Sequence, residues 1–167
     1  MAKTVLYRLF GLGGIPAPLL TRLKGEGLLL LDEGVRGSVT YRDFRAPGRY
    51  SHWKRQWYTS SIALTRVRLV ALRRSSPVID VPLADERIRR LRLSLEGDDT
   101  LLVAFDASLF HGDWSGIIEY RFRTPRPQHF IDAVHERVAG QKIRRQGRDR
   151  SGQVGREFVR HSSMASR

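Results

Sequence analysis

The sequence predicts a mainly β fold with some α structure: a seven-stranded antiparallel sheet that is bent or forms a partly open barrel, capped by one C-terminal amphipathic helix. Three observations predict it. Apolar and polar residues alternate in short runs rich in β-branched and aromatic residues. Turn-forming pairs such as Pro47-Gly48 separate these runs at hairpin spacing. After Pro125 and Pro127, apolar residues recur at helical spacing instead.

The length and charge distribution divide the chain into three parts. Its 167 residues suffice for one domain and some unpacked length. We expect an N-terminal extension at 1–23, a domain at 24–139 and a basic tail at 140–167. The net charge of +13 is concentrated at the ends, and the tail alone has eight basic and two acidic residues. Such a tail attracts any polyanion, including anionic lipid and nucleic acid.

Two absences narrow the class of protein. The chain has no cysteine, which excludes disulfides and thiolate metal sites. Arg8 splits the apolar run near the N-terminus, whereas a signal peptide has an unbroken apolar run. No stretch approaches the ~20 apolar residues of a membrane-spanning helix. We therefore expect a soluble, cytoplasmic protein, with peripheral membrane association as an alternative.

The first elements of the predicted domain are a short helix and a long strand. Pro18 near the start and Gly25 after the end favour a helix from Pro18 to Lys24. Residues 28–45 are predicted to form an interrupted first strand, in which Thr40, Arg42 and Phe44 share one face. Residues 45–51 contain the Pro47-Gly48 pair and are predicted to form a loop.

The next stretch, HWKRQWYTSSIALTRVRLVALRR at 52–74, is the centre of the predicted sheet. It consists of two extended runs that join near Thr65 and Arg66. From here on, strands are predicted at 53–64, 67–73, 78–82, 88–95, 101–106 and 117–123. In the run 88–95 the leucines at 91, 93 and 95 alternate with polar residues, as in a strand with one buried face.

The last predicted element is the amphipathic helix of FIDAVHERVAG, with Thr124 as a candidate N-cap and Gly140 as its end. One face of this helix is apolar and suited to covering the strand layer. From Gln141 onward the chain has too few apolar residues for a core. We expect a mobile tail there, with a short helix around Phe158 as an alternative.

Aromatic residues are concentrated in the central stretch. Trp53 and Trp57 are four residues apart in a predicted strand, and therefore share a face. Because aromatic side chains bury large areas, we expect at least one of them to pack in the core. The alternatives are anchoring at a membrane interface and stacking on nucleic-acid bases.

Motifs for catalysis or metal binding are not found. The chain has no nucleophile elbow, Walker loop or dinucleotide-binding glycine pattern after a strand. His129 and His135 are six residues apart, which does not place them on one helical face. We expect a non-enzymatic protein that needs no cofactor and no metal ion.

Three short motifs resemble a known family. They are Lys24-Gly25-Glu26-Gly27, the run from Ala63 to Val70, and the run from Val78 to Leu83. Over about residues 24–138 the chain resembles bacterial pleckstrin-homology-like (PH-like) and GRAM-like domains, although that family commonly has Asn or Asp at the position of Arg66. The resemblance implies seven strands closed by one C-terminal helix. It also implies a binding role, because domains of this fold bind lipids or peptides or form oligomers.

The resemblance also implies a ligand site, since the loop after the first strand is where pleckstrin-homology domains usually bind phosphoinositide head groups. The basic residues that flank this loop are Arg42, Arg45, Arg49, Lys54 and Arg55. Guanidinium groups suit phosphate oxygens, but strand alternation places Lys54 and Arg55 on opposite faces. The alternative is a solvated hairpin whose charges prevent edge-to-edge aggregation.

The leading hypothesis is therefore a non-catalytic PH-like interaction module that binds anionic phospholipid at a membrane surface or a protein partner. One alternative is a nucleic-acid-binding protein that uses the basic tail and the arginine-bearing sheet face of Arg90, Arg92, Arg121 and Arg123. Another is a homo-oligomer that assembles through strand edges or the helix.

Overall fold

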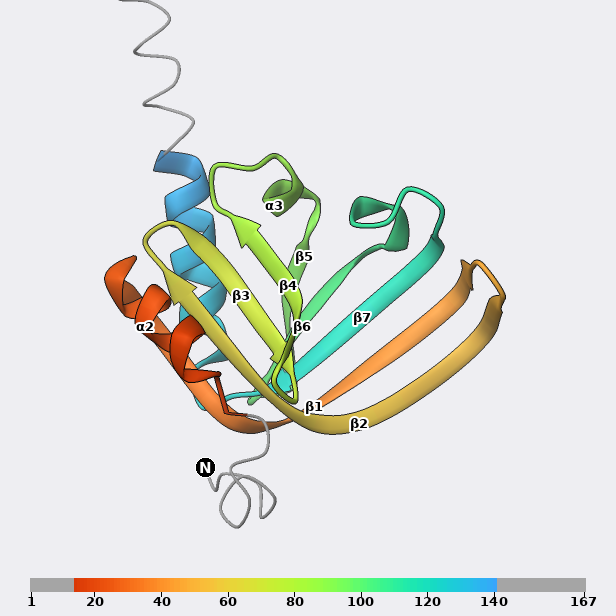
Figure 1. The fold of residues 1–167 in the computed structure, drawn as a ribbon, viewed down its shortest axis with the longest axis horizontal. Helices are drawn as coiled ribbons and strands as arrows, with labels where there is room; N and C mark the ends of the chain where they lie inside the picture. The colour runs from red at the N-terminus through yellow and green to blue at the C-terminus, as the bar shows by residue number, and fades with distance from the viewer. Residues whose placement is uncertain (1–13, 141–167) are drawn as a thin grey trace, which may run out of the picture.

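The computed structural model describes residues 14–140, which form a seven-stranded antiparallel sheet in the order β4-β3-β2-β1-β7-β6-β5 (Figure 1). The sheet does not close into a barrel, and a helix at 127–140 follows it. The strands are β1 (Leu28–Ala46), β2 (Arg49–Thr65), β3 (Arg68–Arg73), β4 (Ser76–Pro82), β5 (Arg92–Glu96), β6 (Thr100–Asp106) and β7 (Ser115–Arg123). The predicted mainly β class, the seven antiparallel strands and the C-terminal helix are confirmed.

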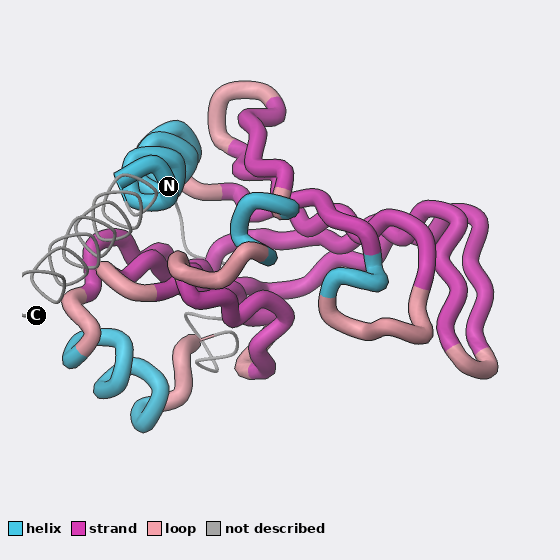
Figure 2. The backbone as a smooth tube through the Cα atoms, turned by 90° about the horizontal axis from the view of Figure 1, so that it is seen from above, coloured by secondary structure: helices cyan, strands magenta, loops and turns pink. Residues whose placement is uncertain are grey.

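β1 and β2 form one long, curved hairpin that joins the two halves of the sheet, β2–β4 on one side and β5–β7 on the other. β1 pairs with β2 over its whole length and with β7 from Gly37 to Arg45. β2 pairs with β3 only from Ser60 to Leu64. The two halves of the sheet therefore meet at the middle of the hairpin, and its far end projects away from the helices (Figure 2).

The β2–β3 half of the sheet is covered on both faces. Ile62 and Leu64 face the main core, to which the C-terminal helix contributes Phe130 and Val134. Ala63, between them, points to the other face, where it packs in a second apolar cluster with Ile15, Leu23, Val70 and Leu72. Leu23 belongs to helix α2 (Ala17–Gly25), which confirms the predicted helix and covers this second face. Burial on both sides explains the nearly continuous apolar sequence of these strands.

The C-terminal helix begins beside a buried polar contact between β1 and the end of β7. The Thr124 hydroxyl donates to the Asp32 carboxylate and accepts from the Arg126 N–H at 3.1 Å. The Arg126 guanidinium lies 3.1 Å from the other Asp32 carboxylate oxygen. Thr124 was predicted as the N-cap, but the helix begins at residue 127, and Thr124 links it to β1 instead.

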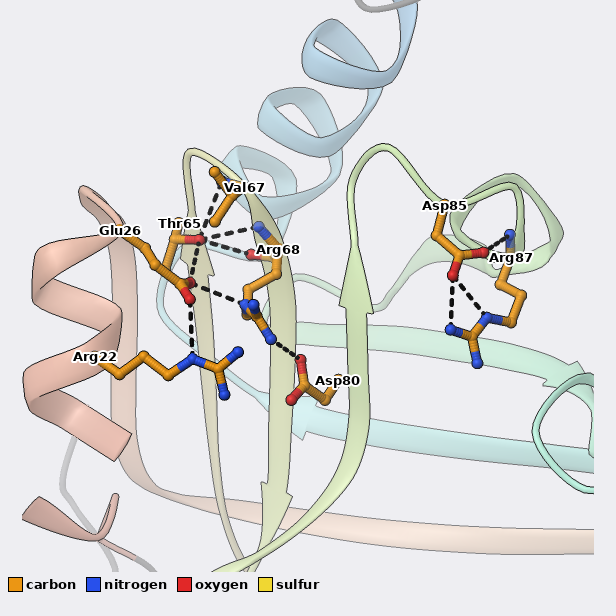
Figure 3. A network of polar contacts seen from close by, with 8 residues as sticks. All are labelled: Arg22, Glu26, Thr65, Val67, Arg68, Asp80, Asp85 and Arg87. Atoms are coloured by element: carbon orange, nitrogen blue, oxygen red, sulfur yellow. Dashed lines mark hydrogen bonds and ion pairs between the residues drawn. The ribbon is translucent and has the colours of Figure 1, made fainter. Parts of the chain in front are cut away.

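The residues of the three resemblance motifs meet in a second polar network (Figure 3). The Thr65 hydroxyl accepts from the N–H groups of Val67 and Arg68 and lies 3.3 Å from the Glu26 carboxylate. The Arg68 guanidinium bridges Glu26 and Asp80, at 2.9 Å from each. These contacts close the β2–β3 turn against the end of α2, so the motifs hold the fold together at this end.

Two predicted element boundaries are wrong. The loop expected at 45–51 is only the two-residue turn of Pro47 and Gly48, because the ladder continues through the pairs Arg45–Tyr50 and Ala46–Arg49. Gly48 has φ +70°, a conformation that glycine adopts without strain. The strand expected at 88–95 starts only at Arg92.

Residues Arg87–Arg90 instead form the short helix α3. The Asp85 carboxylate accepts from the Arg87 backbone N–H at 2.9 Å and pairs with the Arg87 guanidinium, which fixes the start of this turn (Figure 3). Helical spacing then buries both Ile88 and Leu91, whereas a strand would place them on opposite faces.

The predicted position of Phe44 is also wrong. Phe44 was expected to share a face with Thr40 and Arg42, yet it is buried in the core. Asp43 has φ +47°, and the β1–β7 register shifts between Arg42 and Arg45. This bulge reverses the alternation of side chains and turns Phe44 inward.

Among residues 14–140, none of the helices has both the length and the apolar character that crossing a bilayer requires.

Candidate anion-binding face

The side of the sheet opposite the main core, here called the outer face, carries half of the charged side chains of β1, β2 and β7. The register places Ser38 between Trp57 of β2 and Arg121 of β7, and Thr40 between Arg55 and Glu119. The outer face consists of Arg36, Ser38, Thr40, Arg42, Trp53, Arg55, Trp57, Glu119, Arg121 and Arg123, together with Glu96 and Thr100 on β5 and β6. Helix α2 covers β2 and β3 and leaves this part of the sheet uncovered (Figure 1).

The five basic residues predicted as a ligand site do not converge. Arg42 and Arg55 belong to the outer face, whereas Lys54 is paired with Tyr41 and projects from the other side. Arg45 and Arg49 lie at the tip of the hairpin, beside the Pro47-Gly48 turn. Two of the five have polar partners: the Arg42 Nε lies 2.6 Å from Glu119, and the Arg55 Nε donates to the Thr40 hydroxyl at 3.0 Å.

Three aromatic residues of the hairpin are exposed, each with a guanidinium over its ring. Trp53 and Trp57 are 56% and 61% exposed, and Tyr50 is 63% exposed. The guanidinium carbons of Arg55, Arg36 and Arg45 lie 5.7, 4.6 and 5.2 Å from the ring centroids of Trp53, Trp57 and Tyr50, respectively. The expectation that one of the tryptophans packs in the core is wrong. Exposed aromatics held by cations are typical of binding surfaces.

Ion pairs hold the β7 side of the outer face. The Arg121 guanidinium lies 2.9 Å from Glu96 and 3.0 Å from Glu119, and it also donates to Thr40. Burial opposes ionisation of Glu119, but hydrogen bonds from Arg42 and Arg121 outweigh it and hold the pKa of this carboxyl below its ordinary value. Arg121 is therefore fixed in position from both sides.

A pocket of about 310 Å³ opens on the outer face between β2 and the β5–β6 turn. Its lining includes four arginines and two acids, a net charge of +2. The charged residues are Arg36, Arg55, Arg121, Arg123, Glu96 and Asp99, and the others are Gly37, Ser38, Trp57 and Thr100. Asp99 pairs with Arg123, and the hydrogen bond between them lowers the pKa of Asp99.

The pocket was not predicted from the sequence. Arg55 was proposed as a ligand residue, and Arg121 and Arg123 were considered for nucleic acid, but Arg36 and Ser38 were not singled out. The alternation Arg36, Ser38, Thr40, Arg42 was the available signal for a polar strand face. Only the register across three strands reveals that Ser38 lies opposite both Trp57 and Arg121.

A second cavity, also of about 310 Å³, lies between the C-terminal helix and the α3–β5 segment. Its lining is mainly apolar, with Ile88, Leu91, Leu93 and Val138 among its residues. Within 14–140, the histidine and carboxylate side chains form no group of three that could hold a metal ion. His111 stacks on Trp114, with 3.7 Å between the ring centroids.

Comparison of the sequence with models of known protein families and with curated proteins finds no match.

Proposed function

We propose that this chain is a non-catalytic PH-like interaction module that engages an anionic membrane surface through its β1–β2 hairpin. Support for the PH-like assignment comes from the strand order, in which a long β1 joins β2–β4 to β5–β7, and from the C-terminal helix that contributes to the core. The contacts of Arg68 with Glu26, Thr65 and Asp80 add to this support, because they give the resemblance motifs a common structural role.

The observation that carries the proposal is the group of exposed aromatic residues paired with arginines on the hairpin. Trp and Tyr prefer the boundary between lipid headgroups and acyl chains. Arginines bind headgroup phosphates, and each cation near an anionic membrane contributes about 1 kcal/mol. Insertion of one half-exposed tryptophan removes about 100 Å² of apolar surface from water, which contributes about 2 kcal/mol more.

The test is flotation of the full chain with phosphatidylcholine vesicles, with and without phosphatidylserine, at physiological salt. We expect binding only to the anionic vesicles, and a blue shift of tryptophan fluorescence on binding. The variant Trp53→Ala/Trp57→Ala keeps the charge of the chain and leaves Trp114 as the remaining tryptophan. We expect it to lose at least tenfold in vesicle affinity and to lose the blue shift.

A charge variant separates the hairpin from the basic tail. Arg45→Glu/Arg49→Glu reverses two charges at the hairpin tip, and the control Arg89→Glu/Arg90→Glu reverses two charges on α3. We expect the hairpin variant alone to release the vesicles. Equal loss in both variants would mean that binding follows net charge, and the proposal would fail.

A second candidate function is binding of single-stranded nucleic acid. The observation that favours it is that Trp53 and Trp57 lie on one strand with exposed rings and neighbouring arginines, as in stacking platforms for bases. Titration of a labelled oligonucleotide distinguishes this function. It would be favoured if the chain binds the oligonucleotide tightly, loses this binding in Trp53→Ala/Trp57→Ala, and does not float with vesicles. A concentration-dependent sedimentation mass without either ligand would favour self-association instead.

A further inference from the structure

A buried hydroxyl belongs to one of the residues that line the pocket on the outer face. Ser38 is 1% exposed, lines the pocket, and its Oγ has no hydrogen-bond partner among the described residues. A buried hydroxyl without a partner is unfavourable, and most such groups in proteins are satisfied. The neighbouring Thr40 hydroxyl differs, since it accepts from both Arg55 and Arg121. Ser38 is thus a donor that a ligand could satisfy.

The walls of the pocket provide cations in two different states. Arg121 and Arg123 are tied to Glu96 and Asp99, so they are fixed and partly neutralised. Arg36 and Arg55 have no acidic partner within residues 14–140: Arg36 stacks on Trp57, and Arg55 donates only its Nε, to Thr40. Their remaining N–H groups are available to an anion at the same pocket.

We propose that this pocket binds a phosphomonoester group, with the Ser38 hydroxyl and the guanidinium groups of Arg36 and Arg55 as its donors. A phosphomonoester carries a charge between about −1.5 and −2 near neutral pH and offers three acceptor oxygens, which matches a lining of net charge +2 with three separate donors. A carboxylate has one charge and two oxygens and would use fewer of these donors.

The site differs from the loop site considered from the sequence. Arg45 and Arg49 lie at the hairpin tip and do not line the pocket, whereas Arg36 and Ser38 lie near the middle of β1. The group has two sources, a lipid headgroup such as that of phosphatidic acid or a soluble phosphate ester. The lipid source rests on the proposed membrane function; the pocket itself does not.

The test uses the full chain and two probes. The first probe is inorganic phosphate, titrated by calorimetry at constant ionic strength with chloride as the reference. The second is flotation with phosphatidylcholine vesicles containing either phosphatidic acid or phosphatidylserine at matched surface charge. The variant Ser38→Ala leaves the charge unchanged, so attraction by the basic tail is equal in both chains. Ser94→Ala removes a hydroxyl from β5, outside the pocket, and is the matched control.

We expect phosphate to bind the wild-type chain and Ser38→Ala to weaken this binding about tenfold, as for the loss of one hydrogen bond to a charged group. Without ligand, Ser38→Ala should melt at the same or a higher temperature, because it removes an unsatisfied buried hydroxyl. Arg55→Gln, at a partly exposed position, should weaken phosphate binding by a similar factor. Ser94→Ala should change neither property.

Each remaining outcome decides between the two proposals. Phosphate binding that is absent, or that Ser38→Ala and Arg55→Gln leave unchanged, would overturn the pocket assignment even if anionic vesicles float with the chain. Phosphate binding that depends on Ser38 in a chain that binds no vesicle would keep the pocket, assign a soluble phosphate ester as its ligand and refute the membrane function. A preference for phosphatidic acid that Ser38→Ala removes would support both.

Discussion

Replacement of Gly37 by alanine tests how closely strands β1 and β2 of the hairpin approach one another beside the pocket. A Cβ at position 37 would lie 2.6 Å from the Ser60 Oγ and 2.9 Å from the Tyr58 ring, both closer than real Cβ contacts. Neither of these side chains is free to move away. Ser60 is fully buried and donates to the Val35 carbonyl, and Tyr58 donates to the Ser38 carbonyl. Relief therefore requires a shift of the backbone.

The expected size of this effect follows from overpacking of buried sites, which typically destabilises by about 1–3 kcal/mol. We expect Gly37→Ala to lower the free energy of unfolding by about 2 kcal/mol and the Tm by roughly 5–10 °C. The assay is urea unfolding followed by tryptophan fluorescence, with the slope m compared between variants so that a change in the unfolded state is recognised.

A double-mutant cycle identifies the cause. Ser60→Ala removes the atom at 2.6 Å and leaves the Ser60 Cβ at 3.0 Å, so it should reduce but not abolish the penalty of Gly37→Ala. If Gly37→Ala is neutral, or destabilises the wild-type chain and the Ser60→Ala variant equally, the close approach of the two strands is not what requires glycine here.

Two further predictions concern the polar contacts. Thr65→Val keeps the shape of the side chain but leaves the N–H groups of Val67 and Arg68 without their acceptor. We therefore expect the free energy of unfolding, measured in urea, to fall by about 2 kcal/mol. A fall of less than about 0.5 kcal/mol would contradict the role of this hydroxyl. Folding lowers the pKa of Glu119 from its ordinary value of 4.5. The ionised Glu119 side chain therefore stabilises the folded protein fully above that value, and this contribution is lost as the pH falls through the lower pKa of the folded state. The Tm difference between wild type and Glu119→Gln, measured from about pH 7 to about pH 3, should therefore shrink below about pH 4.5; a difference independent of pH would refute the ion-pair contribution.

The elements with a strong local pattern were predictable from the sequence. The strands expected at 67–73, 101–106 and 117–123 are found within two residues of those bounds, because alternation and flanking turns are local properties. The helix expected from Pro18 to Lys24 is found at Ala17–Gly25 for the same reason. The Leu28–Leu31 run, whose pattern fits either helix or strand, is the start of β1.

The features that were missed depend on contacts between distant residues. Ile88 joins the core through the turn of α3, whose first residue, Arg87, is bound by the Asp85 carboxylate, and an alternating leucine pattern does not reveal that contact. Trp53 and Trp57 are exposed because, within residues 14–140, no sheet or helix covers that part of the face of β2; α2 packs farther along the strand. The pocket needs the register of β1 with both β2 and β7, and no single stretch of sequence contains that register.

The limited pairing of β2 with β3 has a consequence for how this chain meets other chains. From Arg49 to Tyr58, β1 is the only strand partner of β2 within residues 14–140, so the opposite side of this segment is a long sheet edge with unpaired peptide groups. Such edges recruit strands from other molecules unless charged side chains discourage it. Lys54 and Arg55 of this segment project from its two faces, and the guanidinium groups of Arg36 and Arg45 lie over the rings of Trp57 and Tyr50, so positive charge surrounds this segment. Positive charge on both faces of this segment is of the kind that discourages such edge-to-edge pairing.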